Sequence, residues 1–247
     1  MKTSNHLLRR LTAALLAAVL ALSIALPVFA SDDGDTIYIN SVSDLLSLAG
    51  SCAYDQWSVG KTVILQKDLS LEGMLWEPIP SFSGQFKGNG HTISDLTITG
   101  QYSPAGLFGI VEEQGSIESL SVRGVVSVSD SADTTTGGIA GINHGTLISC
   151  QFTGVVTGDS EVGGIVGRNE SEGTIDHSTA RAIVTGKSST GGIAGYNLGA
   201  ITGCTNVGSI NTEYPEASLD TDGFTAKMVD YINNKMAAAD DDATNSV

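Results

Sequence analysis

Two carboxylates, Glu118 and Asp176, form the pair of side chains whose type and spacing could support catalysis. Each occupies the same position of a repeated unit, and one intervening copy carries Ile148 there. If the copies stack as β-strand rungs, the two carboxylates share an outward face at roughly 9 to 10 Å. Paired carboxylates could cleave a glycan by acid and base catalysis. A polysaccharide lyase or hydrolase is therefore the enzymatic alternative, by analogy with other β-helices, but we expect no catalytic site because no larger carboxylate cluster accompanies the pair.

Four polar side chains at neighbouring outward positions are the candidates for binding: Arg123, Arg181, Gln151 and Thr179. Gln151 and Thr179 share one column of the repeat, and the two arginines flank Thr153 in the next column. A nearly flat polar surface suits shallow recognition of an extended polymer or of a protein partner. The expected partners are an extracellular glycan or a host or matrix protein, and the arginines favour acidic ligands.

We expect neither a metal nor a cofactor. His91, His144 and His177 occupy three different repeat positions, so they should not gather into a metal site. The glycine blocks are not followed by a helix, which a phosphate-binding loop would need. The formal net charge is −15, with 27 acidic and 12 basic residues. Nucleic acid is therefore disfavoured as a partner, because phosphate binding needs clustered lysines and arginines.

A short glycine-rich block that recurs four times positions all of these residues. Its second residue is Gly106, Gly138, Gly164 and Gly192 in turn, which gives steps of 32, 26 and 28 residues. A recurring unit of this length indicates a solenoid. A propeller blade would need about 40 residues and four strands per unit.

Apolar and small residues recur in three columns behind the glycine blocks. The columns are Ile117, Leu147, Ile175 and Ile201; Leu120, Cys150, Ser178 and Cys204; and Val126, Val156, Val184 and Ile210. Apolar residues two apart between Gly and Asn turns indicate short strands. Each unit is too short to bury its own apolar face, so the units should stack as a parallel β-helix. Residues 92–98 are expected to continue the same columns through Ile93, Leu96 and Ile98.

Asn143, Asn169 and Asn197 each follow the second glycine of their block by five residues. They should therefore form a column at a corner of the coil. Asparagine tolerates the left-handed backbone region, and stacked amides can hydrogen-bond along the column.

The glycine blocks resemble the GLUG motif, which is most complete here as Gly106-Leu107-Phe108-Gly109. The preceding stretch, residues 82–93, is similar to the F-x-G-x-F-x-G-x-G-H-T-I sequence that leads into such repeats. The resemblance covers residues 62–210. It implies a right-handed parallel β-helix and an origin among bacterial secreted or surface proteins, including adhesins and non-catalytic regions of immunoglobulin-A-cleaving metallopeptidases. The H-E-x-x-H of the peptidase members is missing from this chain.

The chain divides into four parts. Residues 1–30 read as a secretory signal peptide, with basic residues before an apolar run and a small residue at Ala30. An uncleaved anchor is the alternative, although the run is short for a membrane span. Residues 31–61 should form a strand and a capping helix, 62–210 the β-helix, and 211–247 a linker, an amphipathic helix and an acidic polar tail. Contact with a membrane is expected only through the signal peptide during export.

Two helices are expected at the ends of the repeat array. The first begins after Ser41 as its N-cap and ends at Gly50. We interpret it as a lid over the open end of the solenoid, and a partner-binding helix is the alternative. The second carries an apolar stripe, Phe224, Met228, Ile232 and Met236, and either docks on the last rung or remains unattached.

Trp76 and the three cysteines have both functional and structural interpretations. Trp76 could stack on a sugar, but packing in an irregular first rung is favoured. Export would permit disulfides. Cys150 and Cys204 are separated by one rung, which exceeds the roughly 7 Å that a disulfide tolerates, so all three thiols are predicted to be free and buried.

The sequence thus predicts a secreted or cell-surface repeat module, without enzymatic activity, for surface display or adhesion. The alternatives are a glycan-active β-helix enzyme and an inert spacer of a truncated larger surface protein.

Overall fold

The computed structural model describes residues 35–54, 56–128 and 134–211. The predicted signal peptide and the predicted C-terminal helix with its acidic tail lie outside the described residues. The domain boundaries at residues 30 and 211 therefore remain predictions.

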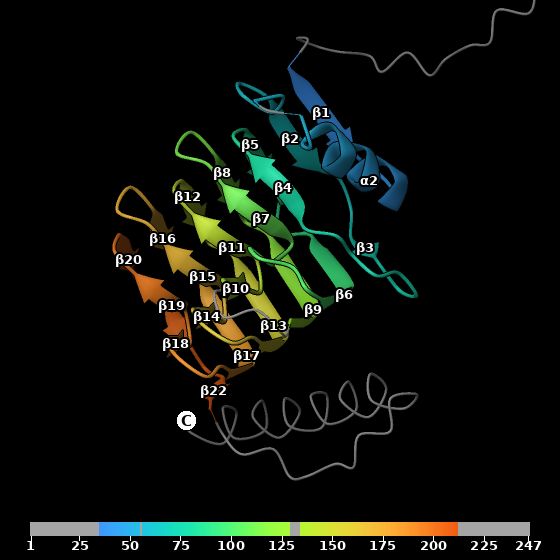
Figure 1. Ribbon diagram of the computed structural model, residues 1–247. Coiled ribbons are helices and arrows are strands. Elements are labelled where there is room, and N and C mark those ends of the chain that lie inside the picture. Colours follow the sequence, from blue (N-terminus) through green and yellow to red (C-terminus); the bar gives the residue numbers. More distant parts are fainter. Residues whose placement is uncertain (1–34, 55, 129–133, 212–247) are drawn as a thin grey trace, which may run out of the picture. The chain divides into compact units, whose positions relative to one another are not determined.

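The described residues form a β-solenoid of parallel strands, with one short helix (Figure 1). The first sheet contains β1 (Thr36–Ile39), β2 (Thr62–Leu65), β5 (Gln85–Lys87), β8 (Ser116–Glu118), β12 (Thr146–Ile148), β16 (Thr174–Asp176) and β20 (Ala200–Thr202). The second contains β3 (Leu69–Ser70), β6 (Thr92–Gly100), β9 (Ser121–Val128), β13 (Gln151–Thr157) and β17 (Thr179–Thr185), and both β21 (Thr205–Asn206) and β22 (Ser209–Ile210) pair with β17. The third contains β4 (Ile79–Phe82), β7 (Phe108–Val111), β11 (Ala140–Asn143), β15 (Val166–Asn169) and β19 (Ala194–Asn197). The fourth contains β10 (Thr136–Gly137), β14 (Val162–Gly163) and β18 (Thr190–Gly191).

The predicted core columns and their register are confirmed. Ile175 pairs with Leu147 on one side and with Ile201 on the other, and Leu147 and Ile175 are fully buried. The Val126 column is also in register. Similar apolar or small residues at each rung keep the same face buried along the stack, because shifting a strand by one residue would turn its apolar side chains outward.

The expected placement of residues 92–98 is wrong by one strand. Phe86, on β5, pairs with Ile117, whereas Ile93, on β6, pairs with Val122. An irregularity in the register between Ile93 and Leu96 then brings Ile98 opposite Val126. Residues 82–93 therefore contribute to two strands of the rung, β5 and β6. The sequence pattern predicted only the second of them.

The asparagine column is confirmed, but its predicted left-handed backbone is wrong. The Nδ2 group of Asn143 donates to Oδ1 of Asn169 at 2.7 Å, and Asn169 donates in turn to Asn197 at 2.8 Å. These three residues end extended strands, and Asn143 and Asn169 are fully buried. A column of left-handed residues instead lies at the corner that follows the first sheet, formed by Ser119, Ser149, His177 and Gly203.

Helix α2 (Val42–Ser51) covers the end of the core next to β1, as predicted (Figure 1). The hydroxyl of Ser41 accepts a hydrogen bond from the N–H of Asp44 and caps the helix. Leu45 and Leu48 are buried in the main hydrophobic core. The helix continues through Gly50 to Ser51, so the predicted end is one residue short.

The favoured interpretation of Trp76 as a packing residue is confirmed, and the alternative of a sugar-stacking platform is excluded by its burial. The indole is 1% exposed, and its Nε1–H donates to the carbonyl of Leu107 at 3.1 Å. Nearby, the rings of Phe82, Phe86 and Phe108 pack together with centroids 5.3 to 6.3 Å apart. An aromatic cluster thus fills the core of the first rungs.

The three cysteines are free, as predicted. Cys52 and Cys150 are buried, whereas Cys204 is only half-buried because it lies on the last described rung. Within the described ranges, no helix is long and apolar enough to cross a membrane.

Candidate functional site

The four predicted binding residues lie together on the outward face of the second sheet. Ser121, Gln151 and Thr179 pair across β9, β13 and β17, which confirms the first outward row. Arg123, Thr153 and Arg181 pair in the next row. These long strands lie side by side over three successive rungs (Figure 1).

Arg123 and Arg181 place two positive charges on this face. They are separated by the Thr153 rung, so their backbones are roughly 10 Å apart. Arg123 is exposed, and its charge contributes to the lowered pKa of Asp68. The main causes of that lowered pKa are a hydrogen bond from the Thr92 N–H and one from the His91 ring. The face thus combines two guanidinium groups with hydroxyl and amide groups.

Arg168 belongs to a different cluster. Its Nε–H donates to Oε2 of Glu161 at 2.7 Å, and a second guanidinium nitrogen contacts the other oxygen of that carboxylate. The guanidinium also lies 5.3 Å from the ring centroid of Tyr196 on the next rung. The contact with Tyr196 joins neighbouring rungs and the pair with Glu161 lies within one rung, so we assign this arginine to the scaffold.

The catalytic candidates Glu118 and Asp176 have the predicted register but do not converge. Both pair with Ile148, which lies between them on the first sheet. Asp176 instead contacts its neighbour His177, whose Nδ1 lies 2.9 Å from its Oδ2. Both carboxylates lie at outward positions, and neither lines the one pocket described below.

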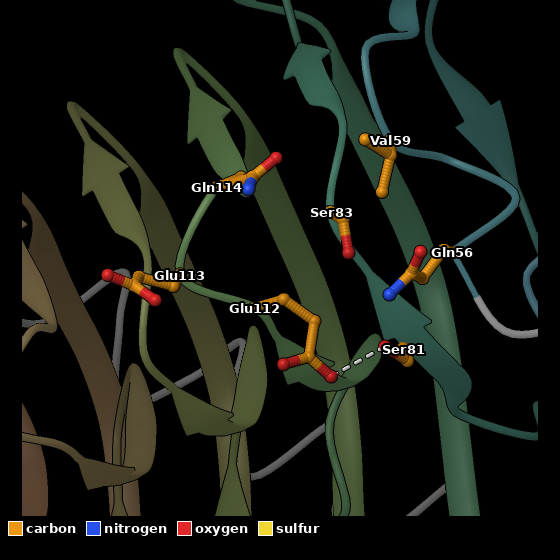
Figure 2. Close-up of a pocket in the computed structure, with 7 residues that line it drawn as sticks. All are labelled: Gln56, Val59, Ser81, Ser83, Glu112, Glu113 and Gln114. Atoms are coloured by element: carbon orange, nitrogen blue, oxygen red, sulfur yellow. Dashed lines mark hydrogen bonds between the residues drawn. The ribbon is translucent and has the colours of Figure 1, made fainter.

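That pocket lies near the N-terminal end of the solenoid and was not predicted (Figure 2). It has a volume of about 250 Å³, and its lining residues are Gln56, Val59, Ser81, Ser83, Glu112, Glu113 and Gln114. Ser81 donates a hydrogen bond to Oε1 of Glu112 at 2.7 Å, and Figure 2 shows these two side chains pointing toward one another. The only sign of this pocket in the sequence is the run Glu112-Glu113-Gln114 at a corner of the coil. The run supplies two carboxylates, and the lining contains no third carboxylate or histidine that could bind a metal.

His91, His144 and His177 do not gather into a metal site. Among the residues that the structure describes, no group of three or more His, Cys, Asp or Glu side chains could hold a metal ion. His91 and His177 lie at the corner between the first and second sheets on different rungs, and His144 lies at the corner between the third and first sheets.

Comparison with known proteins identifies the repeat. The family model of the GLUG motif matches residues 158–185. The resemblance to GLUG-motif proteins is therefore confirmed, and the matched segment contains the glycine block at Gly164 together with the strands on either side.

Two other proteins are similar in sequence to this chain. Halomucin of Haloquadratum walsbyi is 32% identical over 155 residues, which cover 58% of this chain and 2% of halomucin. A candidate Gly-rich membrane protein of Evansella cellulosilytica is 29% identical over 137 residues, which cover 40% of this chain and 16% of that protein. This chain thus spans a small part of the length of both relatives.

One solved structure is also similar. It is described as a candidate immunoglobulin A1 protease from Bacteroides ovatus. The TM-score is 0.41 with 15% identity, and the match covers 74% of this chain and 79% of that one.

Proposed function

We propose that this chain is a non-enzymatic repeat module of a secreted or cell-surface protein, and that it binds an acidic polysaccharide across the outward face of β9, β13 and β17. The observation that carries the proposal is the arginine row. Arg123 and Arg181 occupy the same position of the second sheet on two rungs, and Thr153 lies on the rung between them. A row of hydroxyl and amide groups lies beside them. An extended polymer can follow such a row from rung to rung.

The setting outside the cell is supported by the sequence and by the relatives. The basic and apolar N-terminal segment is typical of an export signal. One relative is described as a Gly-rich membrane protein, and both it and halomucin are similar in sequence to this chain. A β-solenoid with polar outward faces suits display, because each rung adds surface without a new core.

The non-enzymatic part of the proposal follows from the geometry of the carboxylates. Glycoside cleavage needs two carboxyl groups that converge on one bond, and strong electrostatic catalysis needs a site that excludes water. Glu118 and Asp176 stand on an outward column with Ile148 between them. The pocket at Glu112 contains neither residue.

The affinity should be modest and dependent on salt. Each exposed ion pair contributes about 0.2–1 kcal/mol, so replacing both arginines by alanine should cost at most about 2 kcal/mol, or roughly 30-fold in Kd. The net charge of −15 opposes an acidic ligand, and salt screens both effects beyond about 10 Å.

The experiment measures binding of residues 31–247 to acidic and neutral polysaccharides by titration calorimetry, with product analysis for new reducing or unsaturated ends. The variants are Arg123→Ala, Arg181→Ala and their combination. Lys87→Ala is the matched control, because it removes one positive charge from the outward side of the first sheet. If Lys87→Ala weakens binding as much as the arginine variants do, the proposed site is refuted.

The same samples test the enzymatic alternative. Turnover that disappears in Glu118→Gln or Asp176→Asn would overthrow the non-enzymatic proposal. Binding of a protein partner without any glycan would redirect the proposal to host or matrix proteins, and binding of neither would favour an inert spacer.

A further inference from the structure

The last described rung of the solenoid presents an edge strand of every sheet. β20, β19 and β18 are the terminal strands of the first, third and fourth sheets, and β21 and β22 pair with β17 at the end of the second (Figure 1). Within the described part of the chain, each of these strands pairs on one side only. Edge strands offer unpaired N–H and C=O groups to a further strand, so this end of the solenoid can extend all of its sheets.

The apolar core is open at the same rung. Ile201 and Ile210 occupy core columns in which the preceding members, Ile175 and Val184, are fully buried. Ile201 and Ile210 are nevertheless 38% and 39% exposed. Further large apolar side chains are exposed on this rung, namely Tyr196, Leu198 and Val207. The rung therefore has the apolar side chains of a core layer, and no other part of the described chain covers it.

The opposite end of the solenoid is closed. Helix α2 covers the core next to β1, and its Leu45 and Leu48 are buried there. Lys61 and Asp35 place an ion pair beside β1, with Nζ and Oδ1 3.9 Å apart. Covering helices and charged side chains are common means of keeping an edge strand from pairing. A contact between the last rung of one copy and the first rung of another would therefore have to displace α2.

The last rung lacks the charged residues and prolines that protect edge strands. Residues 188–211 contain no Asp, Glu, Lys, Arg, His or Pro. Removing a charge from water is costly unless it is paired, so an uncharged rung can be covered without that cost. This holds although the whole chain has a formal net charge of −15. The rung thus combines unpaired edges, exposed apolar side chains and the absence of charge.

We propose that a second copy of this chain covers the last rung, in a two-fold symmetric dimer joined end to end. Edge strands around an open core need a partner of the same cross-section, and the last rung of another copy has that cross-section. A two-fold axis perpendicular to the solenoid axis reverses the strand direction in the second copy, so the edge strands would pair antiparallel. Both copies use the same surface and both far ends remain covered by α2, so the contact closes as a dimer and forms no fibre.

The dependence on salt separates this contact from the proposed binding of a polysaccharide. Two negatively charged copies repel each other, and salt screens the repulsion, because the Debye length falls from about 30 Å at 0.01 M to about 8 Å at 0.15 M. The uncharged rung itself loses nothing by this screening. The dimer should therefore become stronger with added salt, whereas an acidic polysaccharide at Arg123 and Arg181 should bind more weakly. The inference does not rest on the proposed function.

Sedimentation velocity of residues 31–247 at several protein concentrations, in both salt conditions, tests the dimer. We expect an equilibrium between monomer and dimer. Ile201→Asp places a carboxylate within the contact and should raise the dissociation constant of the dimer at least about tenfold. Leu75→Asp is the matched control, because the Leu75 side chain is 71% exposed and lies outside the last rung. The control should leave the dissociation constant unchanged, and circular dichroism checks that both variants are folded.

Hydrogen exchange locates the contact in the protein without any substitution, so it also serves if Ile201→Asp fails to fold. Amides of residues 190–211 should exchange roughly tenfold more slowly once about nine-tenths of the chains are dimeric, because exchange then proceeds through the remaining monomer. Amides of β1, at the other end, should exchange at the same rate in dilute and concentrated samples. Alkylation of Cys204, which is half-buried on the last rung, should slow with concentration in the same way.

Four results would each overturn the inference. The first is a chain that stays monomeric at every concentration. The second is protection of residues 190–211 that does not change with concentration, because the occupant would then be a segment of the same chain. The third is slowed exchange at β1 or a species larger than a dimer, which would indicate head-to-tail stacking. The fourth is an equal effect of Leu75→Asp and Ile201→Asp, which would place the contact elsewhere.

Discussion

Replacing Asn169 with alanine should destabilise the solenoid far more than the same change at Asn197. Asn169 is fully buried in the middle of the asparagine column. It accepts a hydrogen bond from Asn143 at 2.7 Å, and it donates to Asn197 at 2.8 Å and to the Gly173 carbonyl at 3.1 Å. Asn197 is exposed on the last described rung and donates to Gly199.

The magnitude follows from the groups that lose their partners. Each hydrogen bond contributes about 1 kcal/mol, and a buried polar group left without a partner costs about 1–3 kcal/mol. Asn169→Ala removes bonds on both sides of the rung, although Asn143 keeps its 3.2 Å bond to the Gly145 carbonyl. We therefore expect a loss of about 3 kcal/mol for Asn169→Ala and less than about 1 kcal/mol for Asn197→Ala.

Urea denaturation followed by circular dichroism measures both losses, and thermal melting provides a second estimate. For a chain of this length, 1 kcal/mol corresponds to about 2–4 °C, so Asn169→Ala should lower Tm by about 6–12 °C. Because repeat arrays can unfold in stages, the transition midpoints of the two variants are compared directly. An equal effect at the two positions would refute the view that the buried ladder stabilises the stacking.

Two further predictions concern the core and the thiols. Ile175→Asp should cost several kcal/mol, because it buries an unpaired charge, while Thr179→Asp on the outward face should leave the melting curve nearly unchanged; similar melting of both variants would contradict the register. All three thiols should titrate after denaturation without reductant, and in the native protein at pH 8 an alkylating reagent should modify Cys204 first, because burial raises the pKa of Cys150 to about 12 and that of Cys52 to about 11 and leaves almost no thiolate. Rapid native labelling of Cys150, or a Cys150–Cys204 disulfide in mass spectrometry, would show that the rung assignment is wrong.

The sequence alone determined the register of the repeat. Each rung must bury the same side of its strands against its neighbours, so Ile117, Leu147 and Ile175 recur at matching positions, and their pairing could be predicted without coordinates. The same logic located the outward positions of Arg123 and Arg181 and the helix cap at Ser41. These features depend on local alternation and on the spacing of the repeat.

Only the tertiary structure decided what each position contacts. The asparagine amides point into the core because neighbouring rungs supply their partners, so their strands stay extended and Ser119 and Ser149 adopt the left-handed conformation at the corner instead. The shifted entry strand depends on an irregularity inside β6. Sequence spacing cannot reveal these features, because burial and hydrogen bonding depend on neighbours from other rungs.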